Sequence, residues 1–119
     1  MNAEDIRAYC LEFKGVEESF PFDEHTLVFK VGGKIFLLLA LDSQPLQFNL
    51  KCEPEEAIKL REKFSWVLPG YHMNKRHWNT IVCENQSPKK TIFEWIHASY
   101  FLVFNSLPKK IKAEINALN

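Results

Sequence analysis

Two β-rich runs joined by a glycine pair constrain the fold of this chain more than any other feature. Residues 26–31 are rich in β-branched and aromatic side chains, which favour extended strands. Gly32 and Gly33 follow directly, and glycine accepts the positive φ angles that a two-residue hairpin turn requires. The returning run, residues 34–41, is almost continuously apolar. The pattern predicts an antiparallel hairpin whose second strand lies inside a sheet.

Three further runs complete the predicted sheet. Residues 46–51 alternate between apolar and polar side chains, which is typical of a strand with one solvent-exposed face. Residues 66–68 form a short apolar strand, and residues 78–83 form the fifth predicted strand. The segment 16–24 is expected to be a loop, with the rings of Phe20-Pro21-Phe22 packed against the core. We therefore expect an antiparallel sheet of five strands.

Four helices are expected around this sheet. Asn2 is a suitable cap for the first helix, with Asp5 completing a capping box. Pro54 suits the first turn of the second helix, Ser87 is expected to cap the third, and Pro108 precedes a short last one. The order is α-β-β-β-α-β-β-α plus a short C-terminal helix. Consecutive strands bracketed by helices predict an α+β two-layer sandwich.

The length suits a single domain covering residues 1–119. The longest apolar run, residues 35–41, is too short to cross a bilayer, and the first residues lack the layout of a signal peptide. We therefore expect a cytoplasmic protein without a membrane partner. Cys10, Cys52 and Cys83 are widely spaced and odd in number, so we expect buried thiols rather than disulfides or a zinc site.

The formal net charge is zero, but the charges are unevenly distributed along the chain. Residues 1–42 carry 4 basic and 8 acidic side chains, whereas residues 63–119 carry 8 basic and 3 acidic ones. A positive face can attract a polyanion even on a neutral protein, because the local electrostatic potential matters more than the net charge. The alternative is that the lysines simply solvate helix ends.

Motifs that would indicate catalysis are missing from the sequence, including the phosphate-binding loop, the nucleophile elbow and the dinucleotide fingerprint. His72 and His77 do not have the spacing of metal ligands on a helix or strand, and Lys75 and Arg76 between them would repel a cation. We therefore expect neither enzymatic activity nor a metal or cofactor. The polar cluster Asp23-Glu24-His25 is a minor alternative site.

One segment, residues 69–80, combines cations, histidines, asparagines and aromatic rings. Lysine and arginine neutralise phosphates, asparagine can read an adenine edge, and aromatic rings can stack on bases. The candidate nucleic-acid-binding residues are Lys51, Asn74, Lys75, Arg76, His77, Trp78, Lys109 and Lys110. The cationic side chains are expected to contact phosphates. Asn74 and Trp78 are expected to position the nucleic acid or to stack on its bases. The alternative is a structural loop in which Tyr71 and Trp78 anchor the core.

Several segments together resemble the MmcQ/YjbR family of small bacterial proteins: residues 20–22, 27–33, 49–54, 69–80 and 106–110. The resemblance covers nearly the whole chain in the same order. It implies a CyaY-like fold, also grouped with secretion-chaperone-like sandwiches, and a DNA-binding role with a "double wing" arrangement. It implies no catalytic residues. Glu53 stands where relatives usually have aspartate, which is the better helix cap.

The leading hypothesis is a small non-catalytic protein that binds double-stranded DNA with little sequence preference. The alternative is a protein-interaction or chaperone-like module that binds a peptide, or forms a homodimer, through a sheet edge at residues 46–51 or 66–68. An iron-binding role is disfavoured, because the first helix offers only Glu4, Asp5 and Glu12.

Overall fold

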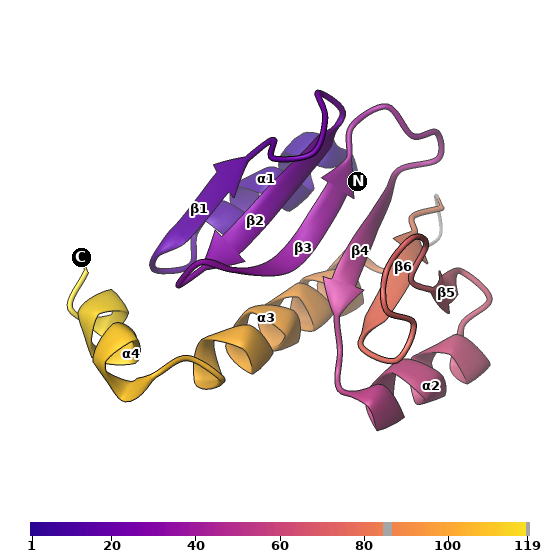
Figure 1. Ribbon diagram of the computed structural model, residues 1–119. Helices are drawn as coiled ribbons and strands as arrows, with labels where there is room; N and C mark the ends of the chain where they lie inside the picture. The colour runs from indigo at the N-terminus through magenta and orange to yellow at the C-terminus, as the bar shows by residue number, and fades with distance from the viewer. Residues whose placement is uncertain (85–86, 119) are drawn as a thin grey trace.

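The computed structural model describes residues 1–84 and 87–118. Its elements are α1 (Ala3–Leu11), β1 (Val16–Ser19), β2 (Thr26–Val31), β3 (Lys34–Ala40), β4 (Gln47–Lys51), α2 (Pro54–Lys63), β5 (Val67–Pro69), β6 (Trp78–Val82), α3 (Lys89–Asn105) and α4 (Lys109–Asn116). The strands form one antiparallel sheet in the order β1-β2-β3-β4-β6-β5. Helices α1 and α3 lie behind this sheet in Figure 1, which confirms the α+β sandwich.

The sheet has six strands rather than the five that were predicted. The additional strand, β1, pairs with β2 from Val16 opposite Val31 to Ser19 opposite Val28. It falls where a loop was expected, because a four-residue edge strand with two glutamates carries little apolar pattern. Phe20 and Phe22 follow β1 at the rim of the sheet and are 49% and 66% exposed. The expectation that these rings pack against the core was wrong.

The glycine hairpin is confirmed. Gly32 and Gly33 have φ angles of 58° and 81° between β2 and β3. Beyond the turn, the pairing of the two strands shifts by one residue at a β-bulge. Phe36 is the additional residue, and the bulge lets it join Leu37 in the core behind the sheet.

The helix starts follow the sequence at three of the four predicted positions, and Pro108 directly precedes α4. Asn2 and Asp5 form the predicted capping box, and Pro54 begins α2. The prediction for Ser87 was wrong. The backbone at Pro88 is still extended, so α3 begins one residue later, and the Ser87 hydroxyl instead accepts a hydrogen bond from the backbone N–H of Glu84 (3.1 Å).

Cys10 and Cys83 are buried as predicted, whereas Cys52 is half-buried. All three cysteines lie within the described part of the chain, and none is in a disulfide. Burial raises the pKa of Cys10 to about 12. Across residues 1–84 and 87–118, no helix is long and apolar enough to span a membrane.

The sheet face opposite α1 and α3 positions the candidate sites. Val28, Leu38 and Trp78 form a small separate apolar cluster, against which Ile35 and Met73 pack. We call this side the open face. The segment from residue 70 to residue 77 connects β5 to β6 and contributes Met73 to this cluster. This segment therefore lies across the open face and separates one end of that face from the other.

Candidate nucleic-acid interface

A groove of about 590 Å³ lies at the end of the open face where β3 begins and β4 ends, and it extends past the sheet to the last turns of α3 on the other side. We call it the basic groove. Its lining comes from the sheet, from the segment before β6 and from the last turns of α3: Lys34, Ile35, Lys51, Cys52, Glu53, His77, Trp78, Leu102, Val103 and Ser106. Three of the eight residues predicted from the sequence, Lys51, His77 and Trp78, therefore lie together.

Antiparallel pairing brings the cationic residues of this groove together. Lys51 is the last residue of β4 and lies opposite Trp78, the first residue of β6. The backbone N–H of Cys52 donates to the carbonyl of His77 (2.7 Å), which keeps His77 beside the end of β4. Because β3 runs antiparallel to β4, its first residue, Lys34, lies at the same end of the sheet.

Trp78 supports Lys51. The ammonium nitrogen of Lys51 is 5.4 Å from the centroid of the Trp78 ring, within the range of a cation–π contact. Trp78 itself is only 7% exposed. A ring this buried offers little surface for stacking on a base, so of the two roles expected for Trp78, positioning or stacking, only positioning stays a prediction. The structural alternative was correct for Trp78 but not for Tyr71, which is 65% exposed.

Lys75, Arg76 and Asn74 lie beside the basic groove rather than in it. The Asn74 amide oxygen accepts the backbone N–H of Arg76 (2.9 Å), and Lys75 donates to the carbonyl of Gly70 (3.2 Å). These contacts shape the loop, and all three residues are exposed. Asn74 thus has a local structural role, while the Lys75 and Arg76 side chains flank the groove.

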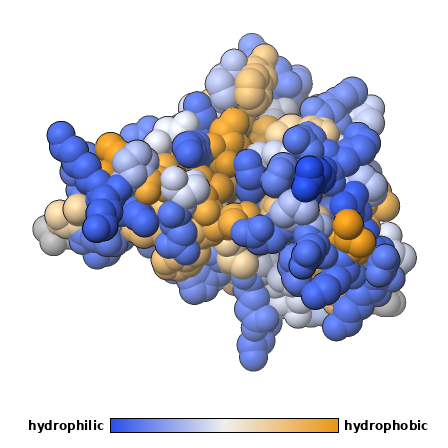
Figure 2. Space-filling model, turned by 60° about the horizontal axis from the view of Figure 1, so that its bottom comes forward, coloured by the Kyte–Doolittle hydropathy of each residue, from blue (hydrophilic) through white to orange (hydrophobic). Residues whose placement is uncertain are grey.

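Lys109 and Lys110 do not line the groove; they begin α4, three and four residues after Ser106, which does. Leu107 packs against Gly32 so closely that an added Cβ there would lie 2.6 Å from a Leu107 methyl group. This contact holds the start of α4 near the β2–β3 hairpin, on the side of Lys34. Figure 2 looks onto this end of the molecule and shows apolar surface between two hydrophilic lobes, one on the α4 side and one on the α2 side.

The sequence reasoning missed Lys34. It is a lysine directly after the hairpin turn, and the register of three strands is needed to place it beside Lys51. Within the groove lining, two lysines and one histidine outnumber the single carboxylate, Glu53. This surplus of donors over an apolar floor suits a phosphate-bearing ligand. In the described ranges, no three histidine, cysteine or acidic residues come together as a metal site would require.

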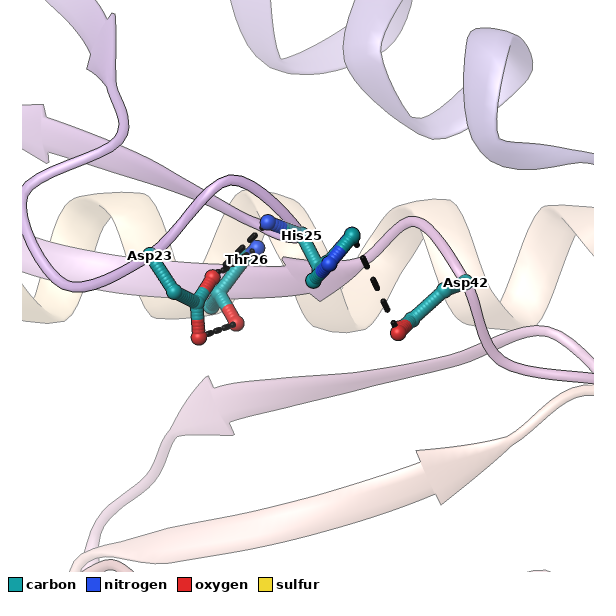
Figure 3. Close-up of polar contacts among 4 residues, drawn as sticks. All are labelled: Asp23, His25, Thr26 and Asp42. Carbon is teal, nitrogen blue, oxygen red and sulfur yellow. Dashed lines mark hydrogen bonds and ion pairs between the residues drawn. The ribbon is translucent and has the colours of Figure 1, made fainter.

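A second groove, of about 630 Å³, lies at the opposite end of the open face, and we call it the acidic groove. Its lining is Phe22, Asp23, Thr26, Leu38, Ala40, Asp42, Ser43, Gln47, Phe48, Asn49, Tyr71, His72 and Met73. Figure 3 shows Asp23 beside Thr26, with His25 and Asp42 nearby. The predicted polar cluster at residues 23–25 thus contributes Asp23 to this groove.

Asp23 is held in place by its neighbours. One carboxylate oxygen accepts the backbone N–H groups of His25 (2.8 Å) and Thr26 (2.7 Å), and the other accepts the Thr26 hydroxyl (3.2 Å). These hydrogen bonds, first that of His25 and then that of Thr26, hold the pKa of Asp23 below its ordinary value. The carboxylate therefore stays charged at neutral pH.

Comparison with known proteins places the chain among uncharacterised relatives. The family model described as YjbR matches residues 11–102. Uncharacterized protein YbdF of Escherichia coli O157:H7 is 34% identical over 108 residues, which cover 90% of this chain and 88% of that protein. Uncharacterized protein YjbR of Escherichia coli (strain K12) is 31% identical over 110 residues, which cover 92% and 93%.

Two solved structures share the fold. The Deinococcus radiodurans protein DR2400, described by the family-model domain DUF419, superposes with a TM-score of 0.91 at 35% identity, over 97% of this chain and 88% of that one. A Pseudomonas syringae protein superposes with a TM-score of 0.73 at 26% identity, over 87% of this chain and 99% of that one. The names of these proteins state no activity or ligand.

Proposed function

Because the chain belongs to the YjbR family, whose model matches residues 11–102, we propose that it is a small, non-catalytic double-stranded-DNA-binding protein that uses the basic groove. The observation that carries this proposal is the convergence of Lys34, Lys51 and His77 from three separate segments. The expected partner is the phosphate backbone, since lysine contacts to phosphate carry no sequence information.

Binding should be weak and strongly dependent on salt. The formal net charge is zero, so long-range attraction depends on the local surplus around the groove. Lys75 and Arg76 immediately precede His77, and Lys109 and Lys110 follow shortly after Ser106, so we expect these four exposed cations to extend this surplus. With about four phosphates contacted, log K should fall with log salt with a slope of about −3.6.

The test is a titration of the protein into a fluorescently labelled duplex of ~20 bp, followed by anisotropy at several salt concentrations. The double variant K75A/R76A should weaken binding and flatten the slope by up to about 2, because it removes two flanking cations. The matched control is K89Q/K90Q, which removes the same charge from the exposed start of α3, outside the groove.

Two outcomes would contradict the DNA-binding proposal. One is that wild-type protein shows no binding even at low salt. The other is that K89Q/K90Q weakens binding as much as K75A/R76A, which would indicate a response to overall charge rather than to this surface.

A second candidate function is protein interaction through a sheet edge. The edge predicted at residues 46–51 was wrong, because β4 lies between β3 and β6. The edge predicted at residues 66–68 corresponds to β5, which is a true edge, and β1 forms the other. Leu68 in β5 and Phe20 beside β1 are 46% and 49% exposed, which favours strand addition at these edges. Size-exclusion chromatography at low and high salt would detect a dimer that salt does not dissociate, whereas a monomer at all concentrations would contradict self-association.

A further inference from the structure

The acidic groove has aromatic walls that the fold itself leaves exposed. Phe22 from the β1–β2 connection and Tyr71 from the β5–β6 connection both line it. They are 66% and 65% exposed, the highest values among the large apolar residues of the described chain. Aromatic surface left in water is unfavourable, and two such rings on one groove indicate a surface suited to a ligand.

The Tyr71 wall is anchored to the sheet. The backbone N–H of Tyr71 donates to the Thr80 hydroxyl (3.0 Å), which in turn donates to the amide oxygen of Asn49. The next residue, His72, has a φ angle of 58°, in the left-handed region that residues with a side chain rarely occupy. A strained residue held by its surroundings next to a cavity is typical of a preorganised site.

The charges of this groove are opposite to those of the basic groove. Asp23 and Asp42 both line it, and among the described residues of its lining none is lysine or arginine. Two histidines are close by: His72 lines the groove, and the Nδ1 atom of His25 lies 4.0 Å from a carboxylate oxygen of Asp42. Asp42 is exposed, so its carboxylate is accessible to a ligand.

A guanidinium group matches this combination of carboxylates and rings. It is planar and stacks on aromatic faces, it is always charged, and it donates two parallel hydrogen bonds to one carboxylate. A groove of about 630 Å³ is within the size range of small-molecule sites. We propose that the acidic groove binds a small guanidinium-bearing molecule, with Asp42 as its principal carboxylate and Tyr71 as the aromatic surface.

The proposal can be tested by NMR, with ¹⁵N-labelled full-length protein titrated with agmatine, a small molecule with a guanidinium at one end and an ammonium at the other. N-acetyl-arginine amide represents the same group on a peptide, and N-acetyl-citrulline amide is its uncharged isostere. Agmatine should shift the amides of residues 23–26, 42 and 71 in a saturable manner. It should bind more tightly than N-acetyl-arginine amide, because its ammonium can reach the second carboxylate, and the citrulline compound should not bind.

Two variants and a control locate the site. D42N should weaken agmatine binding about three- to five-fold, through loss of an exposed ion pair. Y71A should weaken it about two- to five-fold, through loss of the cation–π surface. Both side chains are exposed, so neither change should impair folding. E24Q removes the neighbouring exposed carboxylate, which does not line the groove, and should leave agmatine affinity unchanged.

Three results would overturn the proposal. The first is no saturable shift with agmatine, and the second is equal binding of the citrulline compound, which would show that charge is not recognised. The third is tighter binding of N-acetyl-arginine amide than of agmatine, which would point to arginine in a peptide. Because the groove is separate from the basic groove, D42N should leave duplex binding unchanged, so this proposal and the DNA-binding proposal can fail independently.

Discussion

The two grooves lie at opposite ends of one sheet face and differ in the charge of the residues that line them. At one end β3 begins with Lys34 and β4 ends with Lys51. At the other end β3 is followed by Asp42, and β2 is preceded by Asp23. Because neighbouring strands are antiparallel, the start of one meets the end of the next, so residues far apart in sequence come together at each end of the sheet. A net charge of zero therefore hides two surfaces of opposite character.

The grooves also differ in how their side chains are held. In the basic groove the lysine side chains are long and flexible, and Lys51 is supported by the ring of Trp78. In the acidic groove Asp23 accepts three hydrogen bonds, and the Thr80 hydroxyl holds the backbone of Tyr71. Flexible cations suit a repetitive polyanion, and fixed groups suit a ligand of defined shape. The following predictions test this difference, beginning with the largest effect.

Trp78 belongs to the apolar cluster between the grooves, and its replacement should have the largest effect on stability of all the changes considered. It packs with Val28 and Leu38 on the open face and is 7% exposed. W78A should lower the free energy of unfolding by about 3–5 kcal/mol in urea denaturation, and W78F by less, because a ring remains. A W78A protein as stable as wild type would show that the open-face cluster does not hold the two grooves in place.

Cys52 reports directly on the basic groove, which it lines. Burial raises the pKa of Cys52 to about 11. At pH 8 its thiolate fraction is therefore about 100-fold below that of an ordinary thiol, since each pKa unit is tenfold. The alkylation rate by iodoacetamide should rise about tenfold per pH unit up to about pH 10.

Peptide mapping by mass spectrometry separates Cys52 from Cys10 and Cys83. Duplex should slow the reaction of Cys52 further, and agmatine should not. Alkylation of Cys52 in the native protein at the rate seen in urea would contradict its partial burial and its raised pKa, and protection by agmatine would contradict the separation of the grooves.

The double variant K34Q/K51Q removes the two lysines of the basic groove. Duplex affinity at low salt should fall about tenfold, and the slope of log K against log salt should flatten by about 2, one phosphate contact per lysine. Agmatine affinity should not change. Retention of the wild-type slope, measured beside K89Q/K90Q, would mean that these lysines do not contact phosphate.

The smallest effect is expected for an ion pair outside both grooves. Arg7 in α1 donates two hydrogen bonds to Glu18 in β1, and the hydrogen bond from Arg7 holds the pKa of Glu18 below its ordinary value. The stability that this pair contributes is present at neutral pH and is lost as the pH falls below about 4. E18Q should lower Tm slightly at pH 7, because exposed pairs contribute little.

Calorimetry at pH 7 and pH 3 would measure this difference, which should be smaller at the lower pH. Neither duplex nor agmatine affinity should change in E18Q. A stability difference that grows in acid would contradict the lowered pKa of Glu18.

Local signals carried most of the fold prediction. Gly32 and Gly33 determined a turn, Asn2 a cap and Pro54 a helix start, and each depends only on adjacent residues. β1 was not predicted, because its pairing with β2 depends on tertiary structure and cannot be inferred from its own four residues. The prediction for Ser87 was wrong for the opposite reason. Serine is a good helix cap, but the backbone at Pro88 stays extended, so the helix begins one residue later.

The site was less predictable, because it depends on strand register. Lys51, His77 and Trp78 were found through composition, but Lys34 and Asp42 join their grooves only after β3 is aligned with its neighbours. Trp78 was given a stacking role because sequence shows a ring but not its burial.

The most direct test of the two-groove account is a pair of ¹⁵N NMR titrations on one sample at low salt, first with an unlabelled duplex of ~20 bp and then, on a fresh aliquot, with agmatine. The account predicts that duplex shifts the amides of Lys34, Lys51, Cys52 and His77, whereas agmatine shifts those of residues 23–26, 42 and 71. If duplex shifts only residues of the β1 and β5 edges, or if both ligands shift one common set, the division of the open face into two sites of opposite charge is contradicted.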